Sequence, residues 1–353
     1  MGSSGRTTIN MSTHDESAGP EGYDQPAVEA WIDEHVDSLT PPLDWTRLEG
    51  GHSNLTYRLS DRSGRLAVIR RPPQGELLPK AHDMSREWSL ISALGPTRVP
   101  VPAALAFCES PDITGAWFYV MGLVEGRPLY NAADAIAWVP EDKRRQLAHS
   151  FIDVLADLHD VDPDEVGLSN LGKRNGYVMR QLRTWYRSWT ASAEPANLDD
   201  PRAHELQAFF LEHLPDQGPA RIVHGDYGLH NCLTGRDSFI AAVVDWEIST
   251  LGDPLADLAY SYVACFMGTG EVLELLPGLP TEDDFIGRYC ELTDRGGIPD
   301  WTFYKVFQLF RLAAIAQGVY KRGLDGISSS AKAVTHGDKC RLRAVAAWAM
   351  VAS

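Results

Sequence analysis

Residues 224–231 constrain this chain more than any other part of its sequence. They read H-G-D-Y-G-L-H-N, follow a β-branched pair, and precede a second short apolar run at 242–244 that ends in an acid. Short apolar runs bounded by Gly, Asn and Asp are typical of buried strands. We therefore expect a turn between strands that carries Asp226 and Asn231, with Asp245 at the end of the next hairpin.

This spacing has a chemical consequence. Phosphoryl transfer from a nucleotide needs a carboxylate that accepts a hydroxyl proton and oxygen ligands that hold magnesium on the phosphates. An Asp followed five residues later by an Asn is the spacing of the kinase catalytic loop, H-x-D-x-x-x-x-N. We predict that Asp226 is the catalytic base and that Asn231 and Asp245 are magnesium ligands.

The same tripeptide occurs a second time, at His336-Gly337-Asp338. There Arg343 stands where the Asn would be, and no strand ending in an acid follows. We interpret this second copy as a surface loop. The catalytic assignment therefore rests on the full set of residues and not on the tripeptide alone.

The motif H-G-D-x-x-x-x-N followed by V-V-D-W-E resembles the aminoglycoside phosphotransferase superfamily, which is choline-kinase-like. The longer run V-V-D-W-E-I-S-T-L-G-D-P-L-A-D-L-A-Y at 243–260 is similar to one branch, the kinase domains fused to acyl-CoA dehydrogenases and their free-standing bacterial relatives. Further matches, among them A-V-I-R-R-P-P at 67–73 and F-R-L-A-A-I-A-Q-G-V-Y at 310–320, extend the resemblance over about residues 45 to 325.

The resemblance implies an α+β, bilobed, protein-kinase-like fold with a small N-lobe and a large, mostly helical C-lobe. The sequence pattern agrees, because it predicts a five-stranded antiparallel sheet with one helix, followed by helices. We expect strands near 45–49, 55–60, 66–71, 103–108 and 117–121, and a helix at 79–94. Helices are expected near 141–159, 176–190, 202–214, 254–267 and 301–320, and at the C-terminus in 344–352. The predicted organisation is a disordered tail at 1–25, a nucleotide-binding N-lobe at 26–124, and a catalytic and substrate-binding C-lobe at 125–353.

The nucleotide side is less regular than the catalytic loop. The turn G-G-H-S-N at 50–54 lies where a phosphate-covering loop belongs, so Ser53 and Asn54 are predicted phosphate contacts, although a plain hairpin turn explains the two glycines equally well. Arg70 replaces the usual third-strand lysine. It can hold phosphates in a bidentate fork and pair with Glu87 on the following helix.

Residues 120–123 would form the hinge whose backbone meets the adenine, with Val120, Met121 and Leu123 as the contacts. The expected cofactors are Mg²⁺ and ATP, with GTP as the alternative donor. Gly228 and His230 depart from the residues common in this branch between the base and the metal ligand. That difference alters the electrostatics near the acceptor.

The acceptor should lie between the catalytic loop and the helices near 176–190 and 301–320. Candidate substrate contacts are Glu247, Arg180, Tyr186, Tyr304 and Arg311. Arg180 recurs with Arg183 and Arg187 on one helix face, which is either a solvated basic face or a site for a carboxylate, phosphate or coenzyme A group.

The charge balance bears on partners. The chain carries 32 Lys and Arg against 48 Asp and Glu, a net charge of −16, which argues against nucleic acid or an anionic membrane as the main partner. Its five scattered cysteines fit a reducing cytoplasm. We expect a cytoplasmic monomer or homodimer that binds a small-molecule hydroxyl substrate.

The sequence thus predicts an ATP- and Mg-dependent kinase that phosphorylates a hydroxyl of a small molecule. The resemblance to the dehydrogenase-fused branch implies a hydroxyacyl-CoA or a hydroxy acid. Two alternatives stay open: an aminoglycoside antibiotic kinase, which the overall acidity would suit, and a catalytically silent nucleotide-binding regulator, against which the complete Asp226, Asn231 and Asp245 set speaks.

Overall fold

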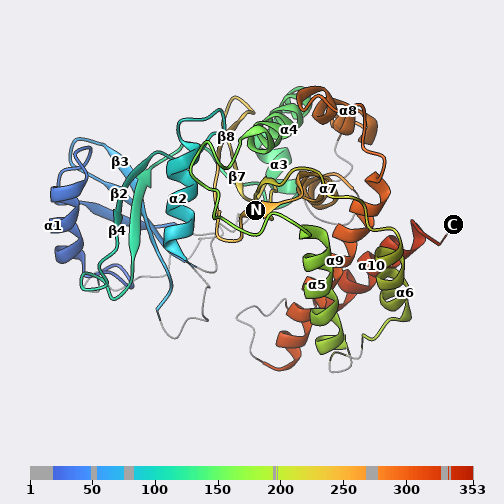
Figure 1. Cartoon of the computed structure of the whole chain (residues 1–353). Coiled ribbons are helices and arrows are strands. Elements are labelled where there is room, and N and C mark those ends of the chain that lie inside the picture. Colours follow the sequence, from blue (N-terminus) through green and yellow to red (C-terminus); the bar gives the residue numbers. More distant parts are fainter. Residues whose placement is uncertain are drawn as a thin grey trace, which may run out of the picture. The chain divides into compact units, whose positions relative to one another are not determined.

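The structure, a computed structural model, describes residues 19–48, 54–74, 83–193, 196, 198–267, 277–326, 333 and 335–352 (Figure 1). The chain divides into two compact units. The first is formed by residues 1–84 and 105–123, and the second by residues 85–104 and 124–353. The glycine turn at 50–53 and the beginning of the helix predicted at 79–94 lie outside the described residues.

The first unit is built on a five-stranded sheet in the order β1-β2-β3-β5-β4. The strands are β1 Asp44–Arg47, β2 Leu55–Ser60, β3 Leu66–Arg71, β4 Ala104–Cys108 and β5 Phe118–Gly122. Strand β2 pairs antiparallel with β1 and β3, and β3 pairs antiparallel with β5. In β2 every second side chain is buried, as expected for a strand with one face on a core.

The helix α1, Gln25–His35, packs Val28 and Ile32 into the core of this sheet. The carboxylate of Asp24 caps its first turn by accepting from Ala27 N at 3.2 Å. Tyr23 belongs to the same core, because its ring is buried and its hydroxyl donates to Leu55 O at 2.9 Å. The tail was predicted to reach residue 25, but its last residues are ordered. Tyr23 packs in the core of the sheet and contacts Leu55, which is distant in sequence.

The second unit is mostly helical (Figure 1). Its helices are α2 Met84–Leu94, α3 Ala132–Trp138, α4 Arg144–Asp160, α5 Tyr177–Ala193, α6 Pro201–Glu212, α7 Pro254–Cys265, α8 Glu282–Leu292, α9 Trp301–Leu324 and α10 His336–Ala349, with a short 3-10 turn at Glu141–Lys143. Two small antiparallel sheets complete it: β6 Arg221–Val223 with β9 Thr250–Gly252, and β7 Cys232–Thr234 with β8 Ile240–Val243.

Helix α9 forms the centre of this unit and contacts α5, α7 and α10. Nearly all of its side chains from Trp301 to Gln317 are buried, among them the polar Lys305, Gln308 and Arg311, as expected for a helix with neighbours on several sides. Within the described residues, no helix is both long enough and apolar enough to cross a membrane. The predicted α+β fold, with its five-stranded antiparallel sheet and helical remainder, is confirmed.

The prediction that His336-Gly337-Asp338 is a surface loop is wrong. These residues form the first turn of α10, and Gly337 is buried. Helix α10 packs against α9, and a side chain at Gly337 would come within 3.3 Å of the Tyr320 ring. The C-terminal helix thus begins eight residues before the predicted position 344, because tertiary packing against α9 carries the first turn.

Candidate active site

The two predicted magnesium ligands, Asn231 and Asp245, lie at the same end of the hairpin formed by β7 and β8. Cys232 lies opposite Val243, so Asn231 and Val244 face each other one position further, where Val244 N donates to Asn231 O at 2.9 Å. Asp245 follows with a φ of 67°, in the left-handed region that non-glycine residues rarely occupy. Such backbone strain is characteristic of functional sites, where the surrounding structure maintains it.

Three side chains hold the carboxylate of Asp226. Asn231 Nδ2 donates to its Oδ2 at 3.2 Å and to the Asp226 carbonyl at 3.0 Å. His230 Nε2 lies 3.3 Å from Oδ2, and the hydroxyl of Tyr260, from α7, donates to Oδ1. The sequence singled out Asn231 but missed Tyr260, since no local pattern links α7 to this loop.

These contacts set the charge of Asp226. Burial pushes the pKa of its carboxyl upwards, but the hydrogen bond and charge of His230, together with the hydrogen bond of Tyr260, outweigh burial and leave the pKa below its ordinary value. The carboxylate is therefore ionised at neutral pH. An ionised carboxylate that lines a pocket can accept a proton from a bound hydroxyl.

The backbone of the loop is anchored by Asp257, which is buried near the first turn of α7. Its carboxylate accepts from His224 N at 2.7 Å and from Gly225 N at 2.9 Å, and His159 Nε2 lies 3.4 Å away. The sequence-based expectation that Asp257 binds backbone amides of this loop is confirmed. Burial raises the pKa of Asp257, but hydrogen bonding and charge from His159 and His224 leave it lowered.

His224 has a structural role, as predicted. Its Nδ1 accepts from Asp226 N at 3.3 Å and its Nε2 lies 3.0 Å from Val244 O, which fixes the proton on Nε2. Its ring packs on Trp246 at 4.7 Å between centroids. His224 therefore ties the loop that carries Asp226 to the strand end that carries Asp245.

Three acids converge beside this hairpin. Oxygens of Glu87, Asp245 and Glu247 all lie within 4.8 Å of one another, and Glu87 is fully buried. Carboxylates this close repel each other unless a cation or a proton intervenes. Magnesium prefers such hard oxygen donors, so the residues fit a divalent cation. The sequence predicted that Glu87 pairs with Arg70. It did not predict that Glu87 lies close to Asp245.

A pocket of about 530 Å³ opens beside Asp226. One wall comes from α5, where Tyr177, Gln181, Trp185 and Ser188 follow one another at helical spacing. Burial raises the pKa of Tyr177 to about 12, so its hydroxyl stays protonated. We call this cavity the Asp226 pocket.

Arg311, a predicted substrate contact on α9, lines the Asp226 pocket. Its guanidinium donates to Gly225 O at 2.6 Å and lies 4.8 Å from the ring centre of Tyr260 and 5.5 Å from that of Trp185. The residue is 7% exposed, and its Nε has no hydrogen-bond partner among the described residues. The pocket thus contains a permanent, well-positioned cation.

Other predicted substrate contacts lie elsewhere. Arg180 donates to Lys173 O at 2.7 Å and to Asn175 O in the segment before α5. The Tyr186 hydroxyl meets His204 Nδ1 at 2.9 Å, and the buried Tyr304 donates to Asp253 at 2.7 Å. The described lining of the Asp226 pocket includes none of these three side chains.

Arg180 and the residues that line the pocket lie on different faces of α5. A helix turns about 100° per residue, so the row that begins at Tyr177 points into the pocket while the row that begins at Arg180 points away. Arg183 and Arg187 on that second row are exposed to solvent. These positions match the solvated-face interpretation of the arginines.

The residues predicted to contact the nucleotide lie in the first unit, Glu87 excepted. Asn54 is buried immediately before β2, and Arg70 on β3 pairs in register with Thr56 and Tyr119. Val120 and Met121 belong to β5, with Leu123 just after it. Ser53 lies outside the described residues. The nucleotide roles of these residues stay predictions.

Known proteins resemble this chain over most of its length. Acyl-CoA dehydrogenase family member 10 of Mus musculus is 36% identical over 322 residues, which cover 88% of this chain and 29% of that protein. Family member 11 of Rattus norvegicus is 34% identical over 325 residues, which cover 87% of this chain and 41% of that protein. The chain thus spans less than half the length of these relatives.

Solved structures show the same fold. A crystal structure from Ralstonia eutropha, provisionally assigned as an aminoglycoside phosphotransferase, is 31% identical with a TM-score of 0.81 and covers 93% of this chain and 98% of its own. A thermostable mutant of an aminoglycoside phosphotransferase, in complex with ADP and hygromycin B, is 17% identical with a TM-score of 0.60, covering 93% and 99%. The predicted fold is therefore confirmed.

A sequence model of the phosphotransferase enzyme family matches residues 44–279. This match includes the loop with Asp226 and Asn231, the strand end with Asp245, and the whole α5 wall of the Asp226 pocket. The chain belongs to the phosphotransferase enzyme family.

Proposed function

We propose that this protein is an ATP- and Mg-dependent kinase that phosphorylates the hydroxyl of a small anionic metabolite, such as a hydroxy acid or a hydroxyacyl-CoA. One observation carries the proposal. The ionised carboxylate of Asp226 lines a 530 Å³ pocket and is hydrogen-bonded to Asn231, on the same hairpin as Asp245. The base and the metal ligands of the proposed reaction thus belong to one connected element.

In this mechanism Asp226 acts on the acceptor hydroxyl. The hydroxyl oxygen attacks the terminal phosphorus of the nucleotide, the new O–P bond forms as the bond to the nucleoside diphosphate breaks, and the hydroxyl proton passes to the Asp226 carboxylate. Tyr260 and His230 orient that carboxylate through their contacts with its two oxygens. Positioning contributes most of the rate enhancement in reactions of this kind.

We assign the metal to Asn231 and Asp245, with Glu247 beside them. Magnesium, when bound, would neutralise charge on the transferring phosphates. The donors are amide and carboxylate oxygens, which suit this hard cation. The strained backbone at Asp245 is consistent with a carboxylate held in place for such a ligand.

The nucleotide is assigned to the first unit. Ser53 and Asn54 would contact its phosphates, Arg70 would position them, and the backbone of 120–123 would meet the base. The ADP complex of the aminoglycoside phosphotransferase with this fold supports nucleotide binding as a general property. Arginine at position 70 suits phosphate because it stays charged and binds in a bidentate manner.

The pocket favours an anionic acceptor over a polycationic one. Arg311 and Arg322 line it, and Asp226 is the one acid among its described lining residues. An aminoglycoside carries several ammonium groups, which these arginines would repel. The mouse and rat relatives, named as acyl-CoA dehydrogenase family members, also point to acyl chemistry.

A screen of nucleotide consumption tests the proposal. ADP release would be followed with Mg·ATP and a panel of hydroxy acids, hydroxyacyl-CoAs, aminoglycosides and amino alcohols, with EDTA and Asp226→Ala as controls. We expect turnover of an anionic hydroxyl compound that EDTA and the variant both abolish. Preference for an aminoglycoside would contradict the substrate class, and failure to bind Mg·ATP would contradict the kinase proposal itself.

A further inference from the structure

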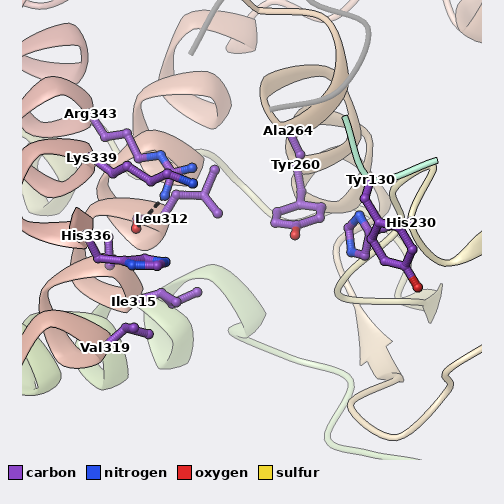
Figure 2. A pocket seen from close by; sticks show the side chains of 11 residues that line it. Tyr130, His230, Tyr260, Ala264, Leu312, Ile315, Val319, His336, Lys339 and Arg343 are labelled. Carbon is purple, nitrogen blue, oxygen red and sulfur yellow. Dashed lines mark hydrogen bonds between the residues drawn. The ribbon is translucent and has the colours of Figure 1, made fainter. Parts of the chain in front are cut away.

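A second cavity, of about 270 Å³, has α9 and α10 on one side and α7 with the loop after Asp226 on the other (Figure 2). The first turns of α10 contribute His336, Lys339 and Arg343, and the loop after Asp226 contributes His230. No acidic side chain lines this cavity among the residues that the structure describes. We call it the α10 pocket. Its lining is basic, although the chain as a whole has a net charge of −16.

The side chains of the α10 pocket are arranged around a common space. Figure 2 shows Lys339 and Arg343 on one side of this space, with Leu312 and Ile315 of α9 beside them, and Tyr260 and His230 on the other side. Arg343 is 4% exposed, and its guanidinium donates to Leu312 O at 3.3 Å. A buried arginine held by a backbone carbonyl is preorganised and loses little freedom when an anion binds.

The electrostatics of α10 favour an anion in this pocket. His336 and Lys339 belong to its first turn, where the helix dipole adds positive potential. Asp338 in the same turn does not offset this charge, because its side chain is 91% exposed and pairs with Arg341 at 3.6 Å. Lys339 and Arg343 are four residues apart, a spacing at which like charges repel on a helix. An anion in the pocket would be attracted by both positive charges.

The α10 pocket adjoins the Asp226 pocket. Tyr260, Leu312 and Ile315 line both cavities. Two residues of the α10 pocket also contact the carboxylate of Asp226 directly, since Tyr260 donates to Oδ1 and His230 lies 3.3 Å from Oδ2. A molecule with a hydroxyl at Asp226 could therefore place its other end among the basic side chains of α10, with its carbon chain against Leu312 and Ile315.

We propose that the α10 pocket binds the anionic group of the acceptor, a carboxylate or a phosphate, while the acceptor hydroxyl lies at Asp226. This inference rests on the proposed kinase function, and it adds a second point of recognition to it. Aliphatic residues between the basic side chains and Asp226 would contact the carbon chain that joins the two groups. The preferred substrates are thus hydroxylated compounds with an anion at a distance from the hydroxyl.

Binding can be measured without any reaction. n-Butyl phosphate and n-butyrate, which lack a hydroxyl, would be titrated calorimetrically into the wild type, Lys339→Gln, Lys339→Arg and Arg341→Gln. Arg341 is the matched control, because it lies on the same helix but points to solvent. We expect Lys339→Gln to weaken binding by about ten- to a hundred-fold, the range for a lost charge-assisted hydrogen bond, with Lys339→Arg and Arg341→Gln near wild type. Equal affinity in wild type and Lys339→Gln, or no binding of either probe, would overturn the inference.

Turnover then tests whether this anion belongs to the acceptor. Hydroxy acids and diols of the same chain length would be compared as substrates in the wild type and Lys339→Gln. We expect a lower KM for the acids, which Lys339→Gln raises about ten-fold or more with kcat and diol turnover little changed. Equal use of acids and diols, with no effect of the variant, would refute the anion subsite while the kinase function stands. Lys339-dependent binding of the probes without turnover of any hydroxyl compound would instead contradict the kinase function, and with it the assignment of the anion to an acceptor.

Discussion

The chain contains the tripeptide His-Gly-Asp twice, and the two copies have different structures. At 224–226 the tripeptide follows strand β6 and forms a turn with Gly225 at a φ of 83°. At 336–338 it forms the first turn of helix α10. In the first copy Asp226 is held by Asn231, His230 and Tyr260, whereas Asp338 is 91% exposed and pairs with a neighbour on its own helix.

The difference lies in the surroundings of each copy. Asp257 accepts hydrogen bonds from the backbone of the first copy, and Arg311 donates to its Gly225 carbonyl. The second copy is held by packing of Gly337 against Tyr320, and its basic neighbours line a cavity instead. The same three residues therefore contribute an acid in one place and part of a basic pocket in the other.

The largest expected effect concerns Asp245, the proposed metal ligand that follows the first tripeptide copy and has no counterpart after the second. Asp245→Asn removes a carboxylate oxygen from the proposed magnesium site, and a metal contributes several kcal/mol to charge stabilisation, so turnover should fall by about 10³-fold. Rates would be measured as magnesium is varied, with Asp338→Asn as the matched acid-to-amide control. An unchanged magnesium requirement in Asp245→Asn would show that this carboxylate holds no metal.

A smaller effect concerns stability and its dependence on pH. The pKa of Asp257 is lowered in the folded state, so its ionised carboxylate adds to the free energy of unfolding. This contribution is fully present above the unfolded pKa of about 3.9 and is lost as the pH falls through the folded pKa. Asp257→Asn should cost about 3 kcal/mol at pH 7, and the gap to wild type should narrow as the pH falls below about 4. Urea unfolding across pH 3 to 7 would measure it. A gap that is constant over this range would contradict the ionised carboxylate.

The smallest expected effect compares the two glycines. Gly225→Ala places a side chain at positive φ, which costs about 1–2 kcal/mol, and its Cβ would lie 3.3 Å from Ile248. Gly337→Ala lies in a helix, where alanine gains up to about 1 kcal/mol, offset by crowding against Tyr320. Thermal unfolding should therefore show a clear loss for Gly225→Ala and a smaller change for Gly337→Ala. Equal losses would mean that both backbones are under the same constraint.

Much of this fold is readable from local pattern. The strands at 55–60 and 66–71 were predicted with their observed limits, because apolar residues, alternating in the first strand and continuous in the second, and a turn around Gly64 mark them locally. The relation between Asn231 and Asp245 also follows from local pattern, since a short hairpin connects them. The start of α10 was missed, because a glycine disfavours a helix locally and the packing of Gly337 against Tyr320 is a tertiary contact.

The parts of the site that sequence did not predict all depend on distant contacts. Tyr260 reaches Asp226 from 34 residues away, and Glu87 reaches Asp245 from helix α2. On α5 the sequence offered Arg180 and Tyr186 as substrate contacts, whereas Gln181 and Trp185 line the pocket. Neighbouring residues such as Arg180 and Gln181 lie about 100° apart around the helix axis. The sequence alone does not say which of them faces the pocket.

The central claim is that Asp226 is the catalytic base and that its tripeptide copy at 336–338 has no part in the chemistry. The most direct test is the turnover number with saturating Mg·ATP and the best acceptor, for wild type, Asp226→Asn and Asp338→Asn. We expect the turnover number of Asp226→Asn to fall by about 10²- to 10⁴-fold while the variant still binds Mg·ATP, and that of Asp338→Asn to stay close to wild type. Turnover of Asp226→Asn close to that of wild type would show that Asp226 is not the catalytic base.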